Sequence, residues 1–545
     1  MIRMIFATVI LLVPLKLIAA PREITTVARN IDQLINKQIQ ENKLSLSPRS
    51  DDAEFIRRLS LDIRGRIPKA DRVQSFLDDQ SSDKRVRLID EFLADTEYGE
   101  HFAIIWYHRM IKIDDDNRLL IRENTLQNWL ASNFNKNRPW NELVRDILLA
   151  SGNRETHPET TFFLAHVDDN KGLHRPAPNK ITSAVSKLFL GIRLECCECH
   201  NHPFNSMKQT DYWGVAAFFS DLHAAQTGNK NAKDGDIPRI FDGSSPVMLK
   251  KKNKKKGGYG ITAIPFGAIA IPDTNGQMMR ARYLEGSDAN VSTHPNLRRL
   301  FVNWVIDSDN KYFAQAAVNK LWANFFGTGL CNPVDDIDPE KVTHPELLRM
   351  LAQDFASSNY DIKWLIRCIC VSDTYQRSSQ VVPGNKEDTK LYSHMRLKVM
   401  SADMLYDSLE IVLGHNVTPL PKKVTGAMNN KGIGTPRERF RNFFHAEADD
   451  DVGVVEDYTH GVPQVLRLMN DPIINRSNAT IYRLMKAGSP EKIIESIFVT
   501  VLSRKPTARE SHRMLDFLAK EGATAKSYND IFWILLNTGE FLFIH

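Results

Sequence analysis

The stretch DDAEFIRRLSLDIRGRIP (residues 51–68) contains signals for both ends of a helix, and it decides the class of fold. Asp51 is followed three residues later by Glu54, a spacing that is typical of a capping box at a helix start. Gly65 is typical of a helix stop, and Pro68 lies just beyond it. The stretch therefore predicts one helix with defined ends.

Similar signals recur on both sides of this stretch. On the N-terminal side, apolar residues at spacings of three and four form one stripe of a helix: Ile24, Val27, Ile31, Leu34, Ile35 and Ile39. On the C-terminal side, Thr343 and Glu346 form a second possible capping box. Caps and glycine stops there predict helices over residues 181–190, 211–219, 296–306, 311–326, 343–358, 489–505 and 527–545. The predicted fold class is mainly α-helical.

The residues from about 226 to 290 differ from the rest because they are rich in Gly, Lys and Pro. Short apolar runs separated by turn signals predict short strands there. We expect the run KKKNKKK (residues 250–256) to be a mobile, solvated loop, because its like charges repel one another. The predicted organisation is a signal peptide at 1–20, a helical domain at 21–225, a β-rich insert at 226–290 and a second helical domain at 291–545.

The charge of the chain argues against one class of partner. The 545 residues carry a formal net charge of +5, but six positive charges lie in the single lysine run. The rest of the chain is therefore close to neutral. Proteins that bind nucleic acids normally have a basic face spread over the fold, so we do not expect nucleic acid as a partner.

The N-terminus is typical of a secretory signal. Arg3 precedes an apolar stretch over residues 5–15, and Ala19 and Ala20 offer a cleavage site. Lys16 ends the apolar stretch before it is long enough to span a bilayer. We expect an exported protein, periplasmic or extracellular, with no stable membrane span after cleavage. An uncleaved anchor is the alternative.

Three of the six cysteines lie in the segment CCECH (residues 196–200). Cys196, Cys199 and His200 fit the pattern C-x-x-C-H of c-type haem attachment, in which two thiols bind the vinyl groups and the histidine binds the iron. Haem c, with a role in redox chemistry or electron transfer to a partner protein, is the first hypothesis. A low-spin haem needs a second axial ligand, and the sequence does not choose among the more distant candidates: His101, His108, His166 and His223.

The same segment allows a second cofactor. Cys197, Cys199, His200 and His202 are ligand types that bind tetrahedral zinc. The alternative function is thus a metal- or disulfide-stiffened binding module for a surface polysaccharide or a partner protein. A polysaccharide-related hydrolase is a third hypothesis, although no G-x-S-x-G, H-E-x-x-H or phosphate-loop motif occurs. The acidic cluster Asp335, Asp336 and Asp338 is expected to be a solvated turn.

The stretch LFLGIRLECCECHNHPFNSMKQTDYWGVAAFF (residues 188–219) resembles the signature of a cytochrome-c-like domain of unknown function from planctomycetes and related bacteria. The C-terminal half, including VLRLMNDPIINR (465–476) and LLNTGEFLFIH (535–545), resembles the usual partner domain, also of unknown function. The resemblance covers residues 24–545 and implies haem at Cys196, Cys199 and His200. Residues 201–204 match the H-P-F segment that follows in the family. Relatives tend to have an acidic residue where this chain reads Trp106, Tyr107, His108.

Overall fold

A computed structural model of the chain describes residues 22–112, 121, 123–170, 173–203, 206–225, 239–243, 248–252, 259–272, 274, 276–284, 286–291, 296–414, 437–438, 440–441 and 479–545. Within these residues, 20 helices and only two-stranded sheets make the protein mainly α-helical, which confirms the predicted fold class. No helix in the described ranges combines the length and the apolar character needed to cross a bilayer. The predicted signal peptide lies outside them.

The N-terminal part contains the helix that the opening stretch predicts. Asp51 caps α2 because its carboxylate accepts the backbone N–H of Glu54 at 2.8 Å, and Gly65 ends the helix with φ of 68°. The side chain of Glu54 does not close the capping box; it accepts the backbone N–H of Ser379 at 2.7 Å instead. The helices of this part are α1 (Ile24–Glu41), α2 (Asp52–Arg64), α3 (Ala70–Asp78), α4 (Lys84–Ala94), α5 (Thr96–Met110), α6 (Glu123–Asn135) and α7 (Trp140–Leu148).

The middle of the chain alternates short helices and hairpins. After α8 (Thr161–Leu164) come the hairpin β1 (Val167–Asn170) with β2 (Leu173–Pro176) and the helices α9 (Pro178–Val185) and α10 (Gln209–Ala216). Three antiparallel strand pairs follow, and all of their strands except β3 lie within the predicted β-rich insert: β3 (Leu222–Ala225) with β4 (Arg239–Asp242), β5 (Met248–Lys252) with β6 (Tyr259–Ala263), and β7 (Ala268–Ala270) with β8 (Met278–Arg280).

The lysine run is only partly the loop that we expected. Lys250, Lys251 and Lys252 belong to β5, where they pair with Ile261, Gly260 and Tyr259 of β6. Residues 253–256 of the run lie outside the described residues.

The C-terminal part is helical again. Its elements are α11 (Leu297–Val305), α12 (Lys311–Phe326), α13 (Pro345–Ser357), α14 (Ile362–Val371), β9 (Lys398–Val399), α15 (Ala402–Leu413), α19 (Ala479–Leu484), α20 (Pro490–Leu502), α21 (Ala508–Glu521), α22 (Ala525–Leu536), α23 (Gly539–Leu542) and β10 (Phe543–Ile544). The predicted capping box before α13 is wrong: His344 is the N-cap, and the hydroxyl of Thr343 donates to the carbonyl of Leu330 at 3.0 Å.

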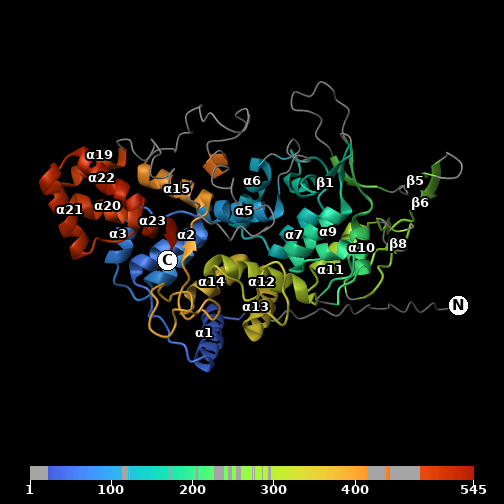
Figure 1. Cartoon of the computed structure of the whole chain (residues 1–545), viewed down its shortest axis with the longest axis horizontal. Helices are drawn as coiled ribbons and strands as arrows, with labels where there is room; N and C mark the ends of the chain where they lie inside the picture. The colour runs from blue at the N-terminus through green and yellow to red at the C-terminus, as the bar shows by residue number, and fades with distance from the viewer. Residues whose placement is uncertain are drawn as a thin grey trace, which may run out of the picture.

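Two hydrophobic clusters hold these elements together. The larger cluster contains side chains from both predicted helical regions, for example Ile31 of α1 and Ile366 of α14. The smaller cluster contains side chains of α15 and α19–α23. It also contains Leu61 of α2 and Ile67, which follows α2. Figure 1 shows the helices of the smaller cluster at one end of the long axis and α9–α11 at the other.

Two adjacent buried arginines of α2 donate hydrogen bonds to backbone carbonyls in the C-terminal part of the chain. Arg57 donates to the carbonyls of Val501 at 3.1 Å and Phe541 at 2.8 Å. Arg58 donates to the carbonyls of Tyr375 at 2.7 Å and His545 at 3.0 Å. These carbonyl groups, together with the carboxylate of Glu54 beside Arg58, satisfy most donors of the two buried guanidinium groups, although Nε of Arg57 has no partner among the described residues.

Candidate functional site

The segment CCECH forms a short turn in which two of the three thiols are accessible. Cys196 and Cys197 lie in the 3₁₀ helix η3 (Glu195–Glu198), and Cys199 follows it directly. A 3₁₀ helix has three residues per turn, so the spacing of Cys196 and Cys199, the residue at the C-cap, corresponds to about one turn. Both are exposed, whereas Cys197 is buried. The turn thus separates a pair of accessible thiols from an inaccessible one.

Cys197 belongs to the protein interior. It is fully buried and is part of the larger hydrophobic cluster. Burial raises the pKa of its thiol, which favours the neutral form over the thiolate that binds zinc. In the described part of the chain, no three His, Cys, Asp or Glu side chains are grouped so that they could hold a metal ion. The predicted zinc ligands Cys197, Cys199, His200 and His202 are therefore not gathered into a metal centre.

Helices α9 and α10 anchor the turn through Glu198, which lies between the two accessible cysteines. Its carboxylate accepts a hydrogen bond from the side-chain amide of Asn179 at 3.0 Å and lies 3.3 Å from the hydroxyl of Tyr212. Its carbonyl accepts the indole N–H of Trp213 at 3.0 Å. Burial raises the pKa of Tyr212, so its phenol stays neutral. Groups of α9 and α10 therefore hold the turn, while the thiols of Cys196 and Cys199 are exposed.

His200 is exposed and has one ring nitrogen engaged. Its Nδ1 lies 2.7 Å from the carbonyl oxygen of Asn201. A carbonyl only accepts, so Nδ1 carries a proton in this contact; in the neutral tautomer with this proton, the lone pair is on Nε2. This is the arrangement in which a histidine can bind a metal through Nε2. His202 is half-buried, and its backbone N–H donates to the carbonyl of Met207 at 2.9 Å, which closes the loop that follows.

The histidines considered as a second axial ligand have other roles in the structure. His101 is buried beside Gly65, and burial lowers its pKa to about 3. The remaining three contact protein groups: His108 lies 3.2 Å from the carboxylate of Asp403, His166 lies 2.7 Å from the carbonyl of Phe162, and His223 lies 3.6 Å from the carboxylate of Asp221. The structure does not single out any of the four as a ligand.

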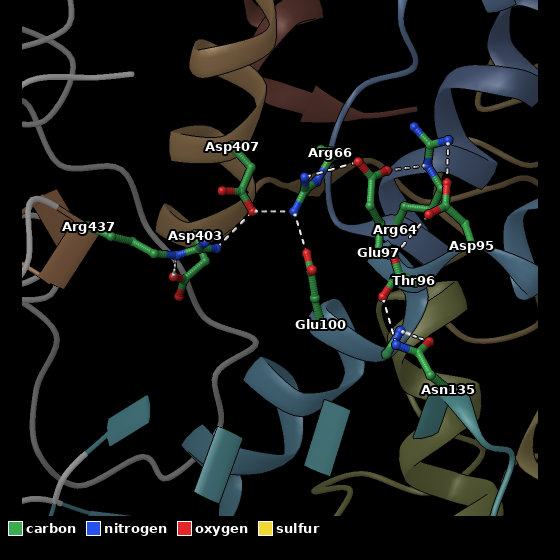
Figure 2. A network of polar contacts seen from close by, with 11 residues as sticks. Arg64, Arg66, Asp95, Thr96, Glu97, Glu100, Asn135, Asp403, Asp407 and Arg437 are labelled. Atoms are coloured by element: carbon green, nitrogen blue, oxygen red, sulfur yellow. Dashed lines mark hydrogen bonds and ion pairs between the residues drawn. The ribbon is translucent and has the colours of Figure 1, made fainter. Parts of the chain in front are cut away.

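A second polar cluster, which the sequence did not predict, lies around α15 (Figure 2). We call it the charge network; its members are Arg64, Arg66, Asp95, Glu97, Glu100, His108, Asp403, Asp407 and Arg437. Arg437 bridges two carboxylates, with 2.7 Å from Nε to Asp403 and 2.8 Å from Nη2 to Asp407. Arg66 lies 3.3 Å from Asp407 and 3.1 Å from Glu97 of α5. The network thus links α5 and the end of α2 to α15.

The two aspartates of α15 have opposite pKa shifts. Burial raises the pKa of Asp407 to about 6, because the charges of Arg437 and Arg66 only partly offset the loss of water. Burial acts on Asp403 in the same direction, but the hydrogen bond and charge of His108, together with Arg437, outweigh it. The pKa of Asp403 therefore lies far below its usual range. Asp403 is the fixed charge of the network, and Asp407 is its titratable member.

The acidic cluster near residue 335 is not simply the solvated turn that we expected. Asp335 is buried, and its carboxylate forms an ion pair with Arg193 at 2.9 Å. The backbone N–H of Arg193 also donates to the carboxylate of Asp336 at 3.2 Å. Arg193 precedes Cys196 by three residues, so this contact fixes the chain where it enters the turn. Asp338 is half-buried and pairs with Lys341 at 3.0 Å.

Comparisons with known protein families divide the chain into two matched regions. Residues 30–224 match the family model PSCyt2, a protein of unknown function (DUF1549). Residues 297–518 match PSD1, a protein of unknown function (DUF1553). The chain therefore carries two domains of unknown function in this order, in agreement with the order that the resemblance implied. No curated protein and no solved structure shows significant similarity to the chain.

The matched regions show where the CCECH turn and the charge network lie in the chain. The CCECH turn lies within the first matched region. The charge network joins the two regions, because Arg66 and His108 belong to the first while Asp403, Asp407 and Arg437 belong to the second. The bacterial group and the haem motif that the resemblance implied stay predictions.

Proposed function

We propose that the CCECH turn attaches c-type haem and that the protein takes part in redox chemistry or electron transfer outside the cytoplasm. Cys196 and Cys199 would hold the group through thioether bonds, and Nε2 of His200 would bind the iron. Bound haem would supply one-electron redox chemistry at its iron. The chain itself supplies two accessible thiols, an oriented imidazole and a rigid support.

One observation carries this proposal: the two thiols of the motif are both exposed, while the third thiol is buried. Covalent attachment requires that Cys196 and Cys199 be reachable from the same side. The three-residue spacing and the exposure of both cysteines support this geometry. Nδ1 of His200 is already bonded to a carbonyl, as is usual for a metal-binding histidine.

The position of Cys197 favours haem over the alternative zinc site. Zinc coordination by the four-residue set needs the Cys197 thiolate on the same side as Cys199. The thiol is in the apolar interior and its pKa is raised, so its removal from the core would cost stability. Haem attachment makes no demand on Cys197.

The test is the production of the full chain in a bacterial host that attaches c-type haem in its periplasm. We expect a covalent Soret-absorbing species that survives denaturation, with the mass of one haem added. Cys196→Ser and Cys199→Ser should each lose at least one covalent bond, whereas the control variant Cys197→Ala should keep both. A colourless chain of unmodified mass, with or without bound zinc, would overturn the proposal.

Export is proposed separately, on the N-terminal signal in the sequence. Fractionation of the native cells should place the mature chain outside the cytoplasm, and N-terminal sequencing should find residues 1–20 removed. Recovery of the intact N-terminus in the cytoplasmic fraction would contradict this part of the proposal.

A further inference from the structure

Gln209, the first residue of α10, is bonded to the chain on both sides of His200. Its side-chain amide donates to the carbonyl of Cys199 at 3.0 Å, and this carbonyl belongs to the peptide bond that joins Cys199 to His200. Its backbone N–H donates to the side-chain oxygen of Asn201 at 3.0 Å. The residues immediately before and after His200 are therefore held by a single residue.

The same amide has a second acceptor. It also donates to the carbonyl of Glu198 at 3.1 Å, so its two N–H groups match two carbonyls. Trp213 lies one helical turn after Gln209 and donates to the same Glu198 carbonyl. Because Trp213 is buried, α10 is fixed to the core at this point, and Gln209 extends that rigid support to the exposed turn.

We propose that Gln209 is a positioning residue that fixes the orientation of His200 and of the accessible thiol at Cys199. An exposed turn held only by its own backbone would sample several conformations. The bonds from Gln209 restrict this freedom next to the imidazole. Only the final step, in which His200 binds haem iron, rests on the proposed function.

The chain allows a close test because Gln209→Glu keeps the size of the side chain and removes both amide donors. A carboxylate can only accept, so it would face two carbonyl oxygens without a hydrogen bond. Gln209→Ala removes the side chain altogether. Gln74→Ala is the matched control, because Gln74 also lies on a helix near the surface and its side-chain amide donates to Asp78 of its own helix.

The first readout needs no haem. In the reduced, haem-free full chain, the rate at which Cys199 is alkylated should rise severalfold in Gln209→Glu and Gln209→Ala, while the rate in Gln74→Ala stays at the wild-type value. The imidazole resonances of His200 in NMR spectra should broaden or shift in the two Gln209 variants alone. Unchanged alkylation and unchanged His200 resonances in both variants would overturn the proposal.

The second readout uses the haem-loaded chain. The Gln209 variants should show a changed iron spin state in the visible spectrum and a shifted midpoint potential, with the covalent mass of haem retained. A spectrum and a potential identical to wild type would overturn the role of Gln209 in iron ligation. If wild type itself binds no haem, the proposed function fails, and the alkylation and NMR results still decide whether Gln209 positions the turn.

Discussion

The CCECH turn and the charge network use polar residues in opposite ways. In the turn, the reactive groups of Cys196, Cys199 and His200 face solvent, and backbone carbonyls receive the supporting hydrogen bonds. In the network, Asp403 and Asp407 are buried, and the charged groups contact one another. The comparison shows that a strongly shifted pKa does not by itself identify a site of chemistry, because mutual burial of charges that join two domains produces such shifts as well.

The largest expected effect is the loss of the fixed charge of the network. Asp403→Asn keeps the size of the side chain but removes the carboxylate that faces Arg437 and His108. Because Asp403 is buried and the half-buried Arg437 would lose one of its two carboxylate partners, the free energy of unfolding should fall by about 3 kcal/mol in urea denaturation. The control is Asp516→Asn at an exposed ion pair with His512, where we expect a change within about 0.5 kcal/mol. Equal losses of unfolding free energy in both variants would contradict the distinction between the buried Asp403 and the exposed Asp516.

The next effect concerns Asp407 and pH. Its pKa of about 6 in the folded protein is above the ordinary value of 3.8, so the folded state holds a proton that the unfolded state has released between these values. Stability due to Asp407 is therefore fully present below about pH 4 and is lost as the pH rises through 6, by up to about 3 kcal/mol. The groups that face Asp407 are Arg66, Arg437 and Asp403.

Denaturation curves measured between pH 4 and pH 7 test this prediction. The stability difference between wild type and Asp407→Asn should change across this range, because the asparagine variant has no proton to release at this position. A constant difference at every pH would show that Asp407 ionises at the same pH in the folded and the unfolded chain.

A smaller effect on the free energy of unfolding should distinguish the buried thiol of Cys197 from the exposed thiol of Cys199. Cys197→Ser places a hydroxyl in the apolar core and should lower the free energy of unfolding by about 1–3 kcal/mol. Cys199→Ser changes an exposed residue and should stay within about 0.5 kcal/mol of wild type in the haem-free chain. Thermal denaturation of the two variants makes the comparison. The prediction is wrong if serine at position 199 costs as much stability as serine at position 197.

The sequence predicted those features whose causes are local. The ends of α2 follow from Asp51 and Gly65, which act on residues within one turn, and the C-x-x-C-H motif is a contiguous segment. Local signals fail where a tertiary contact competes, as at Thr343, whose hydroxyl bonds to Leu330 instead of capping α13. Cys197 is buried because of the hydrophobic residues that surround it in the fold. The spacing of the cysteines in the sequence does not predict these contacts.

The charge network had no local signal. Asp403 and Asp407 lie four residues apart in ADMLYDSLEIVL, a spacing that would also suit the solvated face of a surface helix. His108 is 295 residues from its partner Asp403, and Arg66 is 341 residues from Asp407. Only the folded chain brings them together. The resemblance implies an acid after Trp106, where this chain reads Tyr107 and His108, and His108 contacts an acid of the second matched region.

The two buried arginines of α2 have consequences for folding during synthesis and for the production of fragments. Arg58 finds one of its acceptors 487 residues away, at the carbonyl of His545, and Arg57 depends on Val501 and Phe541. A ribosome therefore releases α2 long before its acceptors exist, and two guanidinium groups must stay hydrated until the last helices have been synthesised. For the same reason, a fragment containing only the first matched region would lack these acceptors, so we expect that region to fold as one cooperative unit with the chain through residue 545.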